Sequence, residues 1–227
     1  MLESATIVFD LDGTLVDTAP DLTNALNHAL TLHGHRPVEA ARVREAVGRG
    51  ALAMIREALG AEPDTQPILD DFLVHYEANI AAESRPFPGA VATLERLTAR
   101  GARLAVCTNK RAHLANLLLE ALGMHHHFAA IAGRDTFEMS KPDPGHLLGT
   151  IAASGGDRTQ AVMVGDSAVD IQAAQGADIP SILVSFGYSP PPPEGPRPSA
   201  VIDGFAALET QAEILLKRLT DHDPTPS

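Results

Sequence analysis

The sequence predicts an α/β protein with a doubly wound parallel sheet, Rossmann-like in architecture, and an inserted helical segment. From residue 89 onward, short apolar stretches alternate with stretches of helical periodicity, the pattern of strands connected by helices on both faces of a sheet. About seventy residues of helical periodicity separate the first strand from this region. Polar residues directly follow several strands, where ligands bind in such sheets. We therefore expect a core of residues 1–15 and 87–227 and a helical cap of residues 16–86.

The first strand is predicted over residues 6–9, which are β-branched or aromatic and mostly apolar. Asp10 and Asp12 follow, and this spacing puts both carboxylates on one side of an extended segment, about 7 Å apart. Gly13 then allows a turn or a close approach to a ligand. Two adjacent carboxylates need a cation, a shared proton or water, and a divalent metal is the simplest partner. The alternative is a solvated turn made of ordinary turn and capping residues.

The insertion is predicted to be entirely helical. Helices are expected over residues 17–32, 38–47, 51–59 and 66–82. No convincing strand pattern is found between Val16 and Pro86. A crossover between parallel strands needs only about a dozen residues, so the surplus predicts a separate domain. The sequence Pro-Phe-Pro-Gly at 86–89 breaks the helical pattern and indicates the return to the core.

The second half of the chain predicts the rest of the sheet. Strands are expected over residues 103–107, 129–132, 161–164 and 181–184, with a last edge strand over 201–202. Helices are expected over residues 90–99, 113–122, 146–153, 169–175 and 206–219. The proline-rich segment 190–193 is expected to be a rigid surface loop. Strands that alternate with helices favour a parallel sheet.

Acidic residues from two strand-end regions are candidate metal ligands. Asp10 and Asp166 are expected to bind Mg²⁺ through carboxylate oxygens, with Asp12 contributing a backbone carbonyl. Asp170 lies four residues after Asp166 at a helix start, so both can face the same side, and the helix dipole favours negative charge there. The alternative for Asp166 is a plain helix N-cap.

Three further residues carry groups suited to a phosphoryl oxygen. Thr108 and Asn109 supply hydrogen-bond donors at a strand end. Lys141 precedes Pro142, which favours an extended conformation that can project the ammonium towards the site. Each has a structural alternative: Thr108 and Asn109 as caps of the next helix, and Lys141 as a surface lysine.

The composition of the chain argues against several classes of protein and of binding partner. The 227 residues are 44% hydrophobic and 20% charged, which is typical of a globular protein. The net charge of −12 argues against a nucleic-acid partner. Cys107 is the single cysteine and cannot form an internal disulfide. Since no signal peptide or membrane-spanning pattern is found, we expect a soluble, cytoplasmic protein with no membrane partner; the oligomeric state is not indicated.

Four motifs together resemble the haloacid dehalogenase-type (HAD) phosphatase superfamily. They are FDLDGT, CTNK, SKPDP and VGDSAVD, in this order and with a helical insertion after the first. The match covers nearly the whole chain. Within the superfamily, LVDTAPDL and the triplet Thr-Asn-Lys are most similar to the phosphoglycolate phosphatase branch. The fold implied is a HAD core with an inserted α-helical cap.

The resemblance implies a role for each matching residue. Asp10 is expected to be the nucleophile that forms an aspartyl-phosphate, and Asp12 the acid that protonates the leaving oxygen and then activates water. Thr108 and Lys141 are expected to hold the phosphoryl group. Asp166 is expected to complete the Mg²⁺ site, with support from Asp170. Positive charge near the phosphate is also what a carboxylate nucleophile requires.

Substrate choice is expected to lie in the cap, acting as a lid over the site. Gly48-Arg49-Gly50 places a basic side chain on a turn, where Arg49 is expected to pair with a substrate carboxylate. The alternative for Arg49 is a solvent-exposed turn. We expect a small phosphorylated acid, 2-phosphoglycolate first, as substrate. Another small metabolite, such as a sugar phosphate or pyrophosphate, and a phospho-accepting signalling module are the alternatives.

Overall fold

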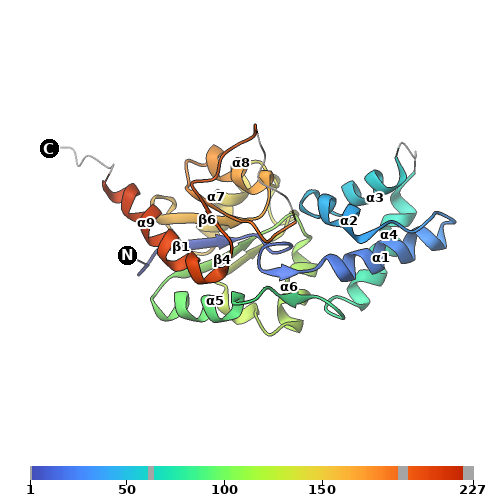
Figure 1. Cartoon of the computed structure of the whole chain (residues 1–227), viewed down its shortest axis with the longest axis horizontal. Helices are drawn as coiled ribbons and strands as arrows, with labels where there is room; N and C mark the ends of the chain where they lie inside the picture. The colour runs from blue at the N-terminus through green and yellow to red at the C-terminus, as the bar shows by residue number, and fades with distance from the viewer. Residues whose placement is uncertain (1, 61–63, 189–193, 222–227) are drawn as a thin grey trace.

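The core is a six-stranded parallel sheet, seen in a computed structural model that describes residues 2–60, 64–188 and 194–221 (Figure 1). The strand order is β5-β4-β1-β6-β7-β8. The central strand pairs with a neighbour on each side, Val8 being opposite Ala105 on one and Met163 on the other. The strands are β1 (Thr6–Phe9), β4 (Arg103–Cys107), β5 (Ala130–Ala132), β6 (Ala161–Gly165), β7 (Ser181–Val184) and β8 (Ala200–Ile202). The predicted doubly wound sheet is confirmed.

Helices cover both faces of the sheet because its strands alternate their apolar side chains. Ile7 and Phe9 pack on the face covered by α5 (Ala90–Ala99), α6 (Ala112–Ala121) and α9 (Leu208–Asp221). Val8 packs on the opposite face, under α7 (Pro144–Ala153) and α8 (Ala168–Gly176). Burial on both faces is why these strands read as continuous apolar stretches.

Helix boundaries differ from the predicted ones where capping decides them. Helix α7 begins at Pro144, two residues before the predicted start, since the Asp143 carboxylate accepts a hydrogen bond from Gly145 N–H and proline is favoured in the first turn.

Within the described ranges, no helix has both the length and the apolar character needed to cross a bilayer. The proline-rich segment 190–193 lies outside the described residues.

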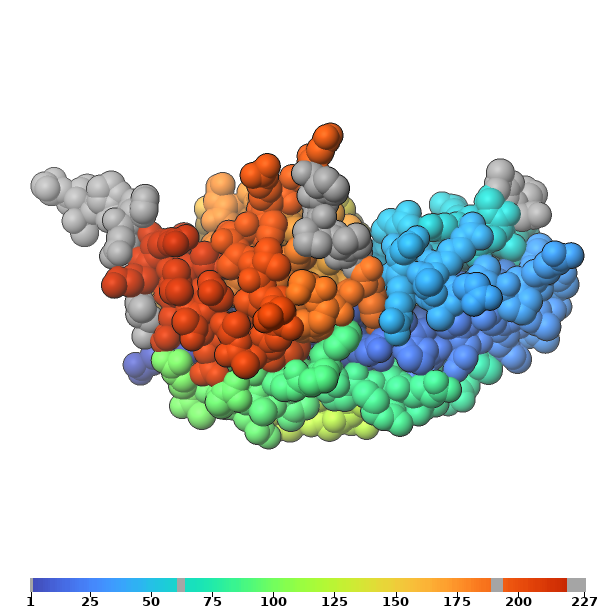
Figure 2. Space-filling view, viewed as in Figure 1, coloured from blue at the N-terminus to red at the C-terminus, as the bar shows by residue number. Residues whose placement is uncertain are grey.

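Between β1 and α5, the described residues form four helices that make a second lobe. Figure 2 shows this lobe beside the rest of the molecule. The four helices lie beyond the end of β1 at which Asp10 is found (Figure 1). Their apolar side chains form a separate cluster that includes Leu26, Ile55 and Phe72. The helices are α1 (Ala19–Leu32), α2 (Ala40–Ala46), α3 (Ala51–Leu59) and α4 (Gln66–Ala78), with a 3₁₀ turn at Val47–Arg49. The division into core and cap at residues 16 and 86 stays a prediction.

Two short strands join the lobes, so the expectation of no strand between Val16 and Pro86 is wrong at both ends. Strands β2 (Val16–Asp17) and β3 (Arg85–Pro86) pair antiparallel. Helix α4 also ends four residues before the predicted boundary. The Asp21 carboxylate accepts hydrogen bonds from Glu83 N–H, Ser84 N–H and the Ser84 hydroxyl, which fixes the returning chain. A strand of two residues is too short to show an alternating pattern of apolar residues, and β2 and β3 lie far apart in the sequence. For these two reasons the sequence does not predict this pair of strands.

Candidate active site

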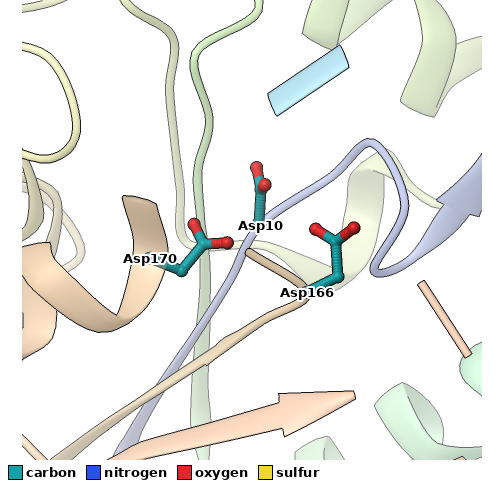
Figure 3. Close-up of side chains that lie close together, drawn as sticks. All are labelled: Asp10, Asp166 and Asp170. Carbon is teal, nitrogen blue, oxygen red and sulfur yellow. The ribbon is translucent and has the colours of Figure 1, made fainter. Parts of the chain in front are cut away.

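Three buried carboxylates converge at the carboxyl ends of two adjacent strands (Figure 3). Asp10 follows β1, Asp166 follows β6, and Asp170 lies in the first turn of α8. One oxygen from each carboxylate lies within 4.8 Å of the others. Because β1 and β6 are hydrogen-bonded neighbours, residues far apart in sequence meet at one edge of the sheet.

Lys141 is the cation of this acidic cluster. Its Nζ lies 2.9 Å from Asp10 Oδ1 and 2.6 Å from Asp170 Oδ1. The lysine is buried, and although burial alone lowers its pKa, the Asp10 and Asp170 carboxylates raise the pKa above the ordinary value. The ammonium therefore stays charged. When all three carboxylates are ionised, this single ammonium leaves two negative charges uncompensated.

The residual charge suits a divalent cation. Burial, together with Asp170, raises the pKa of Asp10 to about 7 and that of Asp166 to about 8, because ionised carboxylates repel one another away from water. A hard cation such as Mg²⁺ binds one or two protein carboxylates together with water and phosphate oxygens. The donor set of Asp10, Asp166 and Asp170 consists only of oxygens and fits such an ion.

Asp166 is held in place by groups from other loops. Its Oδ1 accepts a hydrogen bond from the Thr14 hydroxyl at 3.3 Å, and its Oδ2 from Tyr188 N–H at 2.7 Å. Gly13 has a φ of +80°, and a Cβ there would lie 2.5 Å from Asp166 Oδ2. Glycine is thus required at this position by conformation and by space. The predicted contact of Gly13 with substrate stays a prediction.

The Asp12 carboxylate is held separately from the acidic cluster. Lys110 Nζ lies 2.9 and 3.0 Å from its two oxygens, and the Thr18 hydroxyl donates to Oδ1 at 2.7 Å. Burial opposes the charge on Lys110, but Asp12 and Tyr76 raise its pKa above the ordinary value, so the lysine stays protonated. The predicted contribution of an Asp12 backbone carbonyl to the metal stays a prediction.

Lys110 was missed by the sequence analysis. A lysine directly after a strand-end Thr-Asn pair is the signal that could have found it, because a buried lysine requires a nearby acid. It also lies 4.6 Å from the centre of the Tyr76 ring.

Thr108 and Asn109 lie at the end of β4, next to the site. The Thr108 hydroxyl accepts a hydrogen bond from Lys110 N–H at 3.2 Å. The Asn109 side-chain amide donates to the carbonyls of Lys141 at 3.0 Å and Gly48 at 3.2 Å, so this residue joins the cap to the core. Phosphate binding by both residues stays a prediction.

A cavity of about 440 Å³ lies between the cap helices and this edge of the sheet. Asp12, Asn109 and Lys110 line its polar side, whereas the three carboxylates of the acidic cluster are not among its lining residues. Arg111 and Arg134 also line it. The cap contributes mainly apolar side chains, namely Leu22, Val47, Leu52, Met54, Leu69, Phe72, Leu73 and Tyr76.

Arg49 lies outside this cavity lining. Its guanidinium pairs with Glu57 on α3, and 53% of the side chain is exposed. The exposure agrees with the alternative of a solvent-exposed turn. Substrate binding by Arg49 stays a prediction.

The family follows from comparison with known sequences. A sequence model of the haloacid dehalogenase-like hydrolases matches residues 7–184, which is more than half of the chain. The chain belongs to this family.

Comparison of this haloacid dehalogenase-like hydrolase with individual proteins shows similarity to phosphoglycolate phosphatases. It is 49% identical to the phosphoglycolate phosphatase of Agrobacterium fabrum, over 88% of this chain and 89% of the relative. It is 46% identical to that of Mesorhizobium japonicum, over 95% and 98% of the two chains. A crystal structure of a predicted phosphoglycolate phosphatase from Haemophilus somnus superposes with a TM-score of 0.84 at 29% identity, over 93% and 98% of the two chains. The predictions of a hydrolase that resembles phosphoglycolate phosphatases, and of its fold, are confirmed.

The acidic cluster of this haloacid dehalogenase-like hydrolase predicts that Mg²⁺ raises its unfolding temperature more at about pH 8.5 than at about pH 6.5. The folded-state pKa values of Asp10 and Asp166, about 7 and about 8, lie above the unfolded value of 3.8. The folded protein then binds more protons than the unfolded one, and its metal-free stability falls as pH rises through this range. A divalent cation bound by these carboxylates would offset the repulsion that appears on ionisation.

Differential scanning calorimetry with and without Mg²⁺ measures this effect. Asp166→Asn is the control, since it removes one ligand and one charge and should gain little from Mg²⁺ at either pH. Equal gains for the unmodified protein at both pH values would show that the cluster does not bind the ion as described.

Proposed function

We propose that the protein is a Mg²⁺-dependent phosphatase that hydrolyses a small phosphorylated acid through an aspartyl-phosphate on Asp10. The observation that carries this proposal is the separation of the two strand-end acids. Asp10 lies against Lys141 among the acidic cluster, whereas Asp12 is paired with Lys110. Two carboxylates in different environments suit two different roles.

Asp10 is oriented for attack on phosphorus. Its Oδ1 accepts a hydrogen bond from Leu11 N–H at 2.7 Å and lies 2.9 Å from Lys141 Nζ. We assign Oδ2 as the attacking oxygen. The Lys141 ammonium offsets the charge of the phosphate, and a bound Mg²⁺ would supply further positive charge at the transferring group. In this assignment, the P–O bond to the leaving group breaks as the Oδ2–P bond forms.

Asp12 serves as the acid and then the base. In its protonated form it donates a proton to the leaving oxygen. As a carboxylate it then takes a proton from water, whose oxygen attacks phosphorus and releases phosphate from Asp10. The hydrogen bonds from Lys110 and Thr18 fix the position of this carboxylate.

2-Phosphoglycolate is the first candidate substrate, because relatives up to 49% identical carry the name phosphoglycolate phosphatase. The carboxylate of 2-phosphoglycolate requires a basic side chain in the cavity that Asp12 lines. The cavity volume of about 440 Å³ leaves room for a second candidate, a phosphate ester of a larger metabolite such as a sugar phosphate.

Phosphate release from a panel of small phosphorylated metabolites tests the proposal. We expect Mg²⁺-dependent turnover with the highest kcat/KM for 2-phosphoglycolate. A higher value for sugar phosphates would favour the second candidate. A stable phosphoprotein without phosphate release would instead identify a phospho-accepting signalling module.

Arg134→Gln is expected to raise KM for 2-phosphoglycolate about tenfold or more, the loss expected for a hydrogen bond to a charged group. Arg134 lines the cavity with Asp12, and its guanidinium lies near the cap, where a Cβ on Gly50 would be 3.2 Å from its Nη1. Among the described residues no carboxylate pairs with Arg134, so we propose that it binds the substrate carboxylate.

Steady-state kinetics of this variant on 2-phosphoglycolate and on a neutral phosphomonoester provide the measurement. Arg49→Gln is the matched variant in the cap. If Arg49 binds the substrate carboxylate, as the sequence predicts, Arg49→Gln shows the selective rise in KM and Arg134→Gln does not. Equal effects of Arg134→Gln on both substrates would remove Arg134 from carboxylate recognition.

A further inference from the structure

Tyr188 contacts both the acidic cluster and the first residues of the cap. It follows β7, and its main-chain N–H donates to Asp166 Oδ2 at 2.7 Å. Its hydroxyl donates to Asp17 Oδ1 at 2.7 Å and accepts hydrogen bonds from Thr18 N–H at 2.7 Å and Ala19 N–H at 2.9 Å. One residue therefore links the core to residues 17–19, which we call the hinge.

The Tyr188 hydroxyl caps helix α1 from the core. The first N–H groups of a helix lack partners within the helix and require acceptors from elsewhere. No local side chain fills this role, since the Thr18 hydroxyl is directed to Asp12 and makes no capping hydrogen bond, and the Asp21 carboxylate is bound to the returning chain at Ser84. The tyrosine hydroxyl makes one donated and two accepted hydrogen bonds, which uses its full capacity.

The loop that carries Tyr188 has little room to move independently of Asp166. A Cβ on Gly187 would lie 2.2 Å from Asp166 Cβ and 2.7 Å from the Gly13 carbonyl oxygen. A Cβ on Gly13 would lie 2.8 Å from Tyr188 Cδ2. The loop is therefore packed directly on the acid and on the turn after β1, so a shift of the tyrosine ring moves one of them.

The cap contributes a second contact to the same ring. The Arg44 guanidinium on α2 lies 5.7 Å from the ring centre, and its Nη2 is 3.5 Å from Asp17 Oδ2. Burial, followed by the hydrogen bond to Asp17, raises the pKa of Tyr188 far above its usual range. The hydroxyl thus stays protonated and remains a donor to Asp17.

We propose that Tyr188 is a positioning residue that couples the hinge of the cap to the orientation of Asp166. This proposal rests on the proposed function in one respect, namely that Asp166 binds a divalent cation. A cation that orders Asp166 then also orders the hinge, and a hinge ordered by these hydrogen bonds strengthens cation binding by the same factor, since such coupling is reciprocal.

Hydrogen exchange on Tyr188→Phe tests the coupling. The variant keeps the ring and the main-chain N–H to Asp166 and removes only the hydroxyl. We expect the Thr18 and Ala19 amides to exchange about tenfold faster, as for the loss of one hydrogen bond, while amides of β1 are unchanged. In the unmodified protein Mg²⁺ should slow exchange at the hinge, and in Tyr188→Phe it should not.

Arg44→Gln is the control, since it removes the contact with the ring and the long ion pair with Asp17 but keeps the hydroxyl and its three hydrogen bonds. Its hinge amides should exchange at the unmodified rate and keep their response to Mg²⁺. Steady-state kinetics add a second readout, in which Tyr188→Phe raises the Mg²⁺ concentration needed for half-maximal activity more than it raises KM for substrate.

Calorimetric titration with Mg²⁺ separates failure of this inference from failure of the proposed function. If Mg²⁺ binds and the hinge amides do not respond, or respond equally in Tyr188→Phe, the coupling is overturned and the proposed function stands. If Mg²⁺ does not bind the unmodified protein, the proposed metal dependence fails, and the coupling fails with it.

Discussion

Asp10→Asn should reduce phosphate release by a factor on the order of 10⁴ or more, because the amide oxygen is a poor nucleophile for phosphorus. The same substitution should leave the metal-free protein at least as stable as the unmodified one. Burial and the neighbouring Asp170 carboxylate make ionised Asp10 unfavourable, which is why its pKa is raised to about 7. Lys141 keeps Asp170 as a partner at 2.6 Å after the change.

Phosphate release and thermal unfolding at about pH 8 test both parts of this prediction, because Asp10 is mostly ionised there. Asp170→Asn is the matched control, since it also removes one charge from the cluster but not the proposed nucleophile. It should keep measurable turnover. Near-normal activity of Asp10→Asn would remove Asp10 as the nucleophile, whatever its stability.

Asp12→Asn should slow turnover by about 10²- to 10⁴-fold, since an amide neither donates the proton to the leaving oxygen nor activates water. With an ester of a good leaving group, such as p-nitrophenyl phosphate, the first step needs little acid assistance. The second step still needs the base. The aspartyl-phosphate on Asp10 should therefore accumulate in this variant.

Intact-protein mass spectrometry after mixing with p-nitrophenyl phosphate measures the accumulation. The double variant Asp10→Asn/Asp12→Asn is the control and should acquire no phosphoryl group. Rapid phosphate release by Asp12→Asn, without a phosphorylated form, would assign the acid–base role to another residue.

Asp12→Asn should also be less stable than Asp10→Asn, because it leaves the buried Lys110 ammonium without its carboxylate. Breaking a buried ion pair in this way costs about 3–5 kcal/mol. Should the single variant fail to fold, Asp12→Asn/Lys110→Met removes both charges and allows the same phosphorylation experiment. Its stability should recover, since an apolar replacement of both partners is close to neutral.

Much of the site could be predicted from the chain because its residues follow strands. Asp10 and Asp166 are adjacent to apolar stretches that form neighbouring strands, and parallel strands deliver their carboxyl ends to one edge. The motif SKPDP predicts that Lys141 lies at the same edge of the sheet. The predicted strands at residues 103–107 and 181–184 have the bounds that the structure shows, since both are buried on two faces and read as continuous apolar stretches.

The partners of these residues could not be predicted in the same way. The Thr-Asn-Lys triplet does not reveal the partner of Lys110, and no motif points to Tyr188. The contact from Tyr188 to Thr18 joins residues 170 positions apart. Arg49 and Arg134 are both basic residues at turns, and only their surroundings distinguish them: Arg49 pairs with Glu57, whereas Arg134 lines the cavity.

The sequence by itself determined the family, the parallel sheet and the set of groups available for chemistry, because periodicity and strand-end motifs are local properties of the chain. The tertiary structure decided how those groups are paired: Asp10 with Lys141, Asp12 with Lys110, and Tyr188 with the hinge. Pairing depends on distances of a few ångströms between loops of different strands. Those distances are fixed by packing of the sheet, its helices and the cap, which no single stretch of sequence contains.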